Sequence, residues 1–314
     1  MPFIILSHNI GENDRPKVGG KAFALAGLLR AGIQVPAFLS IASAAYRYFI
    51  AKTGLSERIL LELHRKDFKQ MRWEEVWDCA TRIRNLFLRA AMPADLEQEL
   101  RAAVASRFGD RPVAVRSSAP DEDDAQSSFA GLHESHLNLS GAAAVVDHTR
   151  KVWASLWSDA ALLYRQELGL DVAQSAMAVV VQEMASGERS GIVFSQNPGE
   201  PSQAVVEAVH GLNQGLVDGA IEPDRWVLDR DFGRVMGHTP AQRERRVVAG
   251  AAGVELAVLP AEIAGRPPLS TEEVRAVYAL ARQAEAHFGR PQDVEWTISA
   301  GRLLLLQSRP VTTR

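Results

Sequence analysis

Near the end of the sequence, four polar residues repeat one spacing that could support chemistry on an anionic substrate. Asp293 and Glu295 are two positions apart, and so are Gln307 and Arg309. On two paired strands, this spacing places two carboxylates, an amide oxygen and a guanidinium on one face. Such oxygens suit Mg²⁺, and a guanidinium suits phosphate. A surface hairpin with cross-strand ion pairs is the alternative, but the apolar residues between these positions favour burial.

Two further basic residues follow short patterns compatible with phosphate binding. Lys21 comes after Gly19 and Gly20 at the start of a helical pattern. The spacing is not that of a Walker A loop, but a helix N-terminus with a lysine can bind phosphate oxygens. Arg116 directly follows the predicted buried strand 113–115 and could bind phosphate through its forked guanidinium. An ion pair with the acidic run 121–124 is the other interpretation of Arg116.

Composition and charge exclude several classes of protein. The chain has 314 residues, 46% hydrophobic and 23% charged, which indicates a globular enzyme and excludes overall disorder. A formal net charge of −3 disfavours a nucleic-acid partner. The single cysteine, Cys79, fits a small core residue in a reducing cytoplasm. No signal peptide, membrane span, zinc motif or nucleophilic-serine elbow is visible, so we expect a cytoplasmic location without membrane association.

The elements that must position these residues are a helix-rich first third and a strand-rich remainder. A loop is predicted over 116–128, and a second loop over 249–268. The length favours two lobes, which we place at residues 1–180 and 181–314 of an α+β fold. The predicted helices are 22–29, 42–53, 57–68, 73–90, 93–108, 143–168 (one or two) and 271–288, and the main predicted strands are 113–115, 129–139, 176–184, 191–195, 204–208, 225–229, 234–238, 294–298 and 303–307.

Taken in order, motifs along nearly the whole chain resemble the N-terminal ATP-binding domain of the phosphoenolpyruvate synthase and pyruvate phosphate dikinase family, which includes rifampicin phosphotransferase. Each motif is weak alone, but the ordered set is specific. The motifs are VGGK at 18–21, GIQVP at 32–36, VAVRSSA at 113–119, SFAG at 128–131, VVQEM at 180–184, SGIVF at 190–194, EPDR at 222–225, PQDVEW at 291–296 and LQSRP at 306–310.

The resemblance implies an ATP-grasp-like fold with ATP and Mg²⁺ in the cleft between two lobes. It implies phosphate binding by Lys21, Arg116 and Arg309. It implies Mg²⁺ ligation by Glu295 and Gln307, with Asp293 beside them. The remaining implied contacts come from the adenine and ribose hinge of Gln182, Glu183 and Met184, and from a loop over the phosphates running from Ser128 to Gly131.

The implied reaction transfers the β,γ-diphosphoryl group of ATP to a histidine on another domain or subunit, which leaves AMP and later releases phosphate. No phosphohistidine motif occurs in this sequence, so we expect a phosphohistidine-carrying partner in a hetero-oligomer, as in aryl phosphate synthases that act on phenol or cresols. Where the family reads Gly-Leu-Gly-Glu, this chain has Gly211-Leu-Asn-Gln214. The alternatives are a non-catalytic ATP-sensing module and an ADP-forming kinase or ligase acting on a small molecule.

Overall fold

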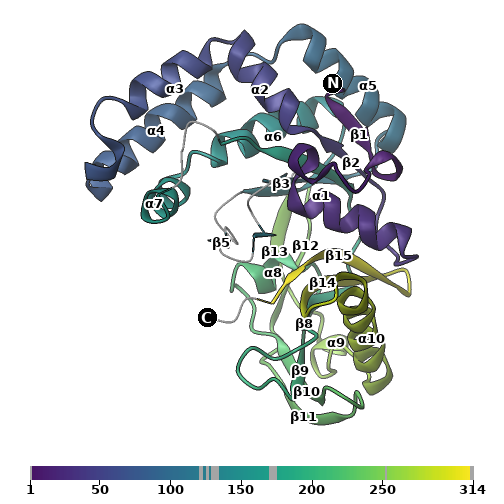
Figure 1. The fold of residues 1–314 in the computed structure, drawn as a ribbon. Coiled ribbons are helices and arrows are strands. Elements are labelled where there is room, and N and C mark those ends of the chain that lie inside the picture. The colour runs from purple at the N-terminus through teal and green to yellow at the C-terminus, as the bar shows by residue number, and fades with distance from the viewer. Residues whose placement is uncertain are drawn as a thin grey trace. The chain divides into compact units, whose positions relative to one another are not determined.

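The computed structural model describes residues 2–119, 123–124, 127–128, 134–169, 175–251 and 253–311. The chain divides into two units (Figure 1). Unit 1 holds the residues up to Phe23 and Ala37–Glu183, and unit 2 holds Ala24–Pro36 and the residues from Met184 on. The segment 24–36 therefore groups with the later part of the chain, and the lobes placed at 1–180 and 181–314 stay a prediction.

Unit 1 is built on a five-stranded antiparallel sheet in the order β1-β2-β7-β3-β6. The apolar run predicted at 176–184 forms the central strand β7, whose middle residues are all buried. A continuous apolar run is typical of a strand covered on both faces. The strands are β1 (Ile4–Leu6), β2 (Phe38–Ile41), β3 (Val113–Ser118), β6 (Ser135–Leu139) and β7 (Ala178–Glu183), and a separate short pair joins β4 (Asp123–Asp124) to β5 (Ser127–Ser128).

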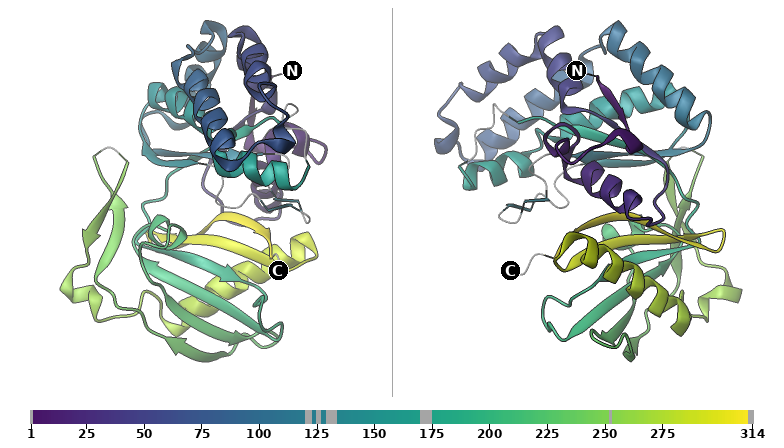
Figure 2. Two further views of the ribbon diagram at one scale, coloured as in Figure 1. Left: turned by 90° about the vertical axis from the view of Figure 1, so that its left-hand side faces the viewer. Right: turned by 45° about the vertical axis from the view of Figure 1, so that its right-hand side comes forward.

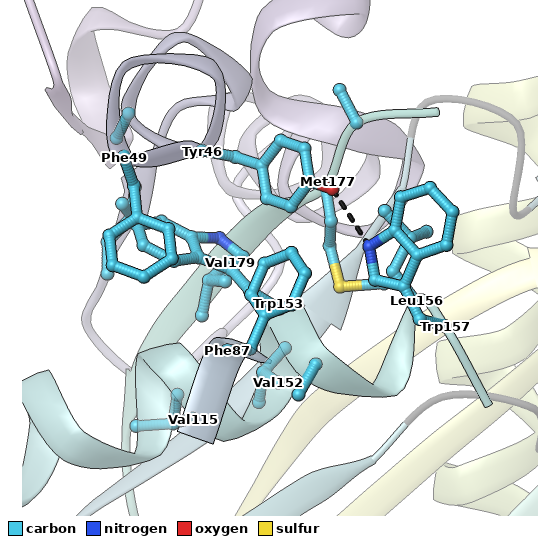
Figure 3. Close-up of a cluster of buried hydrophobic side chains, with 14 of the residues drawn as sticks. Tyr46, Phe49, Phe87, Val115, Val152, Trp153, Leu156, Trp157, Met177 and Val179 are labelled. Atoms are coloured by element: carbon cyan, nitrogen blue, oxygen red, sulfur yellow. Dashed lines mark hydrogen bonds between the residues drawn. The ribbon is translucent and has the colours of Figure 1, made fainter. Parts of the chain in front are cut away.

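Helices of unit 1 bury an aromatic cluster against this sheet (Figure 3). Tyr46, Phe49, Phe87 and Trp153 have ring centroids 5.2 to 5.9 Å apart. The Trp157 indole N–H donates to the Tyr46 hydroxyl at 3.0 Å, which satisfies a polar group inside the core. The helices are α1 (Arg15–Arg30, shared with unit 2), α2 (Ser43–Lys52), α3 (Leu55–Leu63), α4 (Trp73–Arg89), α5 (Ala94–Phe108), α6 (Ala142–Ser155) and α7 (Asp159–Glu167), with 3-10 turns η1 (Ser7–Asn9) and η2 (Phe68–Gln70).

Unit 2 contains a six-stranded antiparallel sheet in the order β11-β10-β9-β8-β14-β15. Helix α10 (Thr271–Phe288) packs on one face of this sheet (Figure 2). Ser270 and Glu273 form a capping box at its start, since the side chain of each accepts from the backbone N–H of the other. The strands are β8 (Arg189–Phe194), β9 (Gln203–His210), β10 (Asp224–Asp229), β11 (Val235–Thr239), β14 (Gln292–Ser299) and β15 (Arg302–Pro310).

The structure confirms the α+β class and corrects two predicted loops. Residues 116–118 continue β3, because they pair with β7 and extend the sheet. The segment 249–268 is not a loop, since β12 (Arg245–Ala249) and β13 (Val254–Val258) form a hairpin, followed by α9 (Ala261–Ala264). The remaining helix is α8 (Gln214–Val217). Within the described part of the chain, no helix combines the length and apolar character needed to span a membrane.

Candidate functional site

In unit 1, α1 has a kink at Gly19, where a new helical segment starts, and hydrogen bonds tie this helix start to the end of β3. The Ser118 hydroxyl accepts from the backbone N–H of Ala22 at 3.2 Å and donates to the carbonyl of Val18 at 2.8 Å. The backbone N–H of Gly20 donates to the carbonyl of Ala119 at 3.2 Å. A strand end and a helix start that share these bonds hold the side chains between them in fixed positions.

Lys21 is held beside the end of β3 because Gly19 permits a very close approach between the backbones of α1 and β3. Gly19 has φ +78° and ψ 171°, and a Cβ there would lie 1.8 Å from the carbonyl oxygen of Ser118. The Lys21 ammonium donates to the Ser117 hydroxyl at 3.2 Å. Sequence reasoning identified the lysine but assigned both serines to a loop, and so missed that they position it.

Arg116 and Gln182 come together across two neighbouring strands of unit 1. One Arg116 Nη lies 3.5 Å from Oε1 of Gln182, at the limit for a hydrogen bond. Gln182 is only 2% exposed, and its Nε2 has no hydrogen-bond partner among the described residues. The arrangement therefore holds a guanidinium beside a buried amide whose donor is unsatisfied.

The other predicted contacts, at the end of unit 1 and in the loop 128–131, are described only in part. Glu183 ends unit 1 and Met184 begins unit 2. The Glu183 carboxylate pairs with Arg111 at 2.6 Å, and its backbone N–H donates to the carbonyl of Ala37 at 2.7 Å. Ser128 lies in β5, where only the backbone is described, and Gly131 lies outside the described residues.

In unit 2, the predicted pairing of the last two strands is present. Asp293 is opposite Arg309, and Glu295 is opposite Gln307. These four residues therefore share one face of the sheet, as their spacing predicted. The other face carries the fully buried side chains of Val294 and Trp296, and α10 packs there.

A β-bulge makes this polar face possible. Glu295 pairs with Gln307, but the next residue, Trp296, pairs with Leu305, so Leu306 is the extra residue. Without the bulge, Leu305 and Gln307 would point to the same side, because side chains alternate along a strand. With the bulge, Leu305 joins the buried face and Gln307 turns to the polar face.

The Asp293 carboxylate and the Arg309 guanidinium form a close pair. Nε and one Nη of Arg309 each lie 2.8 Å from the same oxygen, Oδ2 of Asp293. Asp293 is 6% exposed, and burial raises the pKa of its carboxyl, while Arg309 opposes that shift. Its Oδ1 has no hydrogen-bond partner within the described residues. Asp293 thus orients Arg309 and keeps one buried acceptor oxygen.

Glu207 on β9 extends the polar face and was not predicted. It pairs with Ile192, which in turn pairs with Glu295, so Glu207, Glu295 and Gln307 lie in one row across the sheet. Burial raises the pKa of Glu207, and Arg225 opposes that shift from 3.8 Å. The sequence feature that could have identified Glu207 is its place as the single charged residue in the apolar strand 204–208.

The oxygen donors of this face fit a shared rather than a fully protein-bound Mg²⁺ site. Among the described residues, no group of three or more His, Cys, Asp or Glu side chains is arranged to hold a metal ion. Mg²⁺ usually takes one or two protein ligands and completes its shell with water and substrate phosphates. Glu295 and Gln307, directly opposite each other, fit that pattern.

The segment 211–214, where this chain differs from the Gly-Leu-Gly-Glu sequence of the family, directly follows the end of β9. Gly211 has φ +87°, and its N–H donates to the carbonyl of Glu188 at 2.8 Å. Asn213 is 7% exposed, and neither polar atom of its side chain finds a hydrogen-bond partner within the described ranges. Gln214 donates to Asp218 on the surface. The asparagine is therefore buried, while the glutamine is engaged locally.

Comparison with known protein families shows to which family the chain belongs. Residues 15–314 match the family described as the pyruvate phosphate dikinase AMP/ATP-binding domain. The chain belongs to this family. Membership confirms the resemblance stated above and makes ATP the nucleotide that the family description supports.

Three relatives show the range of named functions within the family. A probable phosphoenolpyruvate synthase of Archaeoglobus fulgidus is 38% identical over 100% of this chain and 42% of its own length. A rifampicin phosphotransferase of Streptomyces sviceus is 36% identical over 99% and 36%, and a probable phosphoenolpyruvate synthase of Methanocaldococcus jannaschii is 32% identical over 100% and 27%. The chain therefore spans less than half of each of these relatives. A solved structure from Pyrococcus horikoshii matches 82% of this chain and 100% of its own, at a TM-score of 0.31 and 10% identity. A similarity this low does not indicate a shared fold.

Proposed function

We propose that this chain is the ATP-binding catalytic part of a phosphoenolpyruvate-synthase-like phosphotransferase. It binds ATP and Mg²⁺ and passes the β,γ-diphosphoryl group to a histidine on a separate domain or subunit. The bond between the α,β-bridging oxygen and the β-phosphorus breaks, a nitrogen–phosphorus bond forms, and AMP leaves. Water then releases the terminal phosphate, and the phosphohistidine serves a final acceptor, for which we put forward a phenol or cresol. The observation that carries the proposal is the match to an AMP/ATP-binding family over residues 15–314.

The geometry of unit 1 supports phosphate binding by Lys21 and Arg116. The lysine is fixed by the Gly19 approach and its bond to Ser117. A cation held in place before the substrate arrives stabilises developing negative charge without rearranging during the reaction. The buried, unsatisfied Nε2 of Gln182 supports a role in receiving the adenine or ribose, because such a donor is costly unless a ligand accepts from it.

The polar face of unit 2 supports the metal and the third phosphate contact. Glu295 and Gln307 would hold Mg²⁺, which when bound neutralises charge on the phosphate oxygens. Arg309, oriented by Asp293, would contact the transferring group through its forked donors. Glu207 would add negative charge beside this site. The ATP-grasp-like arrangement, with lobes at 1–180 and 181–314 and ATP between them, remains part of this proposal.

The test follows the fate of ATP labelled at its β-phosphorus. The chain is incubated with ATP, Mg²⁺ and the phosphohistidine-carrying domain or subunit that completes it, and AMP, ADP and labelled partner are measured. We expect AMP and a labelled partner. Arg309→Ala and Glu295→Gln should each reduce transfer at least about 100-fold, the range found when one charge-stabilising group is removed. Arg302→Ala, at an exposed position on the same strand as Arg309, is the matched control and should transfer normally.

The outcomes separate the proposal from its alternatives. Formation of ADP alone would replace it with a direct kinase or ligase. ATP binding without any turnover in the presence of the partner would identify a sensing module. Normal transfer by Arg309→Ala would remove that residue from the site.

A further inference from the structure

Unit 2 has a cavity lined by arginines, which we name the arginine pocket. It has a volume of about 880 Å³ and lies between the β10–β11 turn and α10. Its lining includes Arg230, Arg234, Arg275 and Arg282, with Phe232 and Tyr278. The volume lies in the range of small-molecule sites.

The turn that carries Phe232 is ordered by its own hydrogen bonds. Oδ1 of Asp229 accepts from the backbone N–H of Asp231 at 3.0 Å and of Phe232 at 2.8 Å. The N–H of Gly233 donates to the carbonyl of Asp229 at 2.9 Å, and Gly233 has φ +65°. Phe232 is nevertheless 87% exposed. A fixed turn thus presents an aromatic ring that the fold of unit 2 does not bury.

The opposite wall of the pocket is the outward face of α10. Arg275, Ala279, Arg282 and Ala286 follow one another at intervals of four, three and four residues, which places them on one face of a helix. The buried residues of α10, such as Val277, face the sheet instead. The arginine pocket is therefore separated from the polar face of the sheet, which lies on the other side.

The balance of charge within the pocket is positive, because its four arginines outnumber one lining carboxylate, Asp231, and the adjacent Glu285. Glu285 pairs with both Arg230, at 2.7 Å, and Arg282, at 2.8 Å. Arg234 and Arg275 are exposed, and neither guanidinium makes an ion pair or hydrogen bond with the described residues. Since the whole chain carries a formal net charge of −3, this concentration of arginines does not follow from composition.

We propose that the arginine pocket binds a nucleotide, with its phosphate on Arg234 and Arg275 and its base stacked on Phe232. Guanidinium groups bind phosphate through paired N–H donors, and an exposed aromatic ring stacks on any base. The site is distinct from the polar face of unit 2 and does not depend on the proposed function. Inorganic phosphates share part of this chemistry, so the experiment must separate the two ligand sources.

The test titrates AMP and, separately, inorganic pyrophosphate into the protein by isothermal calorimetry. Wild type is compared with the double variant R234A/R275A. We expect the variant to lose one AMP-binding event or to bind there at least tenfold more weakly, while its thermal unfolding is unchanged. R58A/K69A removes the same charge from exposed positions in unit 1 and should bind as wild type does. Identical isotherms for wild type and R234A/R275A would overturn the proposal.

Two further variants sharpen the result. F232A should weaken binding of AMP but not of pyrophosphate, because only AMP has a ring to stack. If F232A weakened the binding of AMP and pyrophosphate equally, or weakened neither, the ligand would be a simple phosphate anion and the assignment of a nucleotide would be overturned. E295Q should leave the arginine pocket intact, so loss of the catalytic site and loss of this pocket are distinguished.

Discussion

Replacing Gly19 with alanine is the sharpest test of how the structure positions Lys21. The backbone of Gly19, at φ +78° and ψ 171°, lies in a region that is essentially restricted to glycine, at a cost of about 1 to 3 kcal/mol for other residues. The new Cβ would also lie 1.8 Å from the carbonyl oxygen of Ser118, so one of the two backbones must move by more than an ångström.

Moving the backbone at Gly19 or Ser118 breaks hydrogen bonds, and the free energy lost with them adds to the strain in the backbone dihedral angles. The hydrogen bonds from Gly20 to Ala119 and from Ala22 to Ser118 are the nearest, and each contributes about 1 kcal/mol. We therefore expect Gly19→Ala to lower the free energy of unfolding by roughly 3 to 5 kcal/mol, the sum of these two costs. ATP binding should weaken as well, because Lys21 moves with the helix start.

The measurement is urea unfolding followed by tryptophan fluorescence, with ATP binding followed by calorimetry. Gly54→Ala is the matched control in the same unit, because Gly54 has φ +68° but nothing lies within 4 Å of an added Cβ. It should cost only about 1 kcal/mol and leave ATP binding unchanged. The reasoning is refuted if Gly19→Ala costs no more than Gly54→Ala.

Three other predictions test the packing and charges around the site. Arg243→Ala should destabilise unit 2 by roughly 1.5 to 3 kcal/mol in urea, since it removes two donors from the Asp224 carboxylate, which is 1% exposed and keeps only His238 as a described side-chain partner. Adding Asp224→Asn should recover part of the loss. Phe87→Ala should cost about 3 to 5 kcal/mol, and a loss below 1 would contradict the packing of the aromatic cluster. The hydrogen bond from the Lys151 ammonium holds the pKa of the Asp147 carboxyl below its usual value. The stability that this ionised carboxylate contributes is therefore present at neutral pH and is lost as the pH falls through the lowered pKa. Asp147→Asn should flatten the acid side of a curve of unfolding free energy against pH.

Local patterns predicted much of the fold. Helix α10 and its capping box follow from the apolar period after Ser270 and from Glu273 three residues on. Asp293 shares a face with Glu295, and Gln307 shares one with Arg309, because the members of each pair are two residues apart on one strand. These features depend on residues close together in the sequence, where backbone geometry leaves few alternatives.

The error at 116–118 involves pairing between distant segments, and the missed hairpin has a local cause. Ser117 and Ser118 were predicted in a loop because their polarity resembles one, but pairing with β7 extends the strand. Which residues pair across such a distance is decided by the whole sheet. The hairpin β12–β13 was missed because Gly250 and Gly253, which lie between its strands, are typical of a loop.

The sequence by itself determined the family and the α+β class, and it indicated the residues that we propose for the site. Only the tertiary structure decided how several of them are held: the bulge at Leu306 that turns Gln307 to the polar face, the close approach at Gly19 that fixes Lys21, and the row that brings in Glu207. The physical reason is that side-chain type is a property of one residue. Its direction and burial depend on backbone partners that lie far away in the chain.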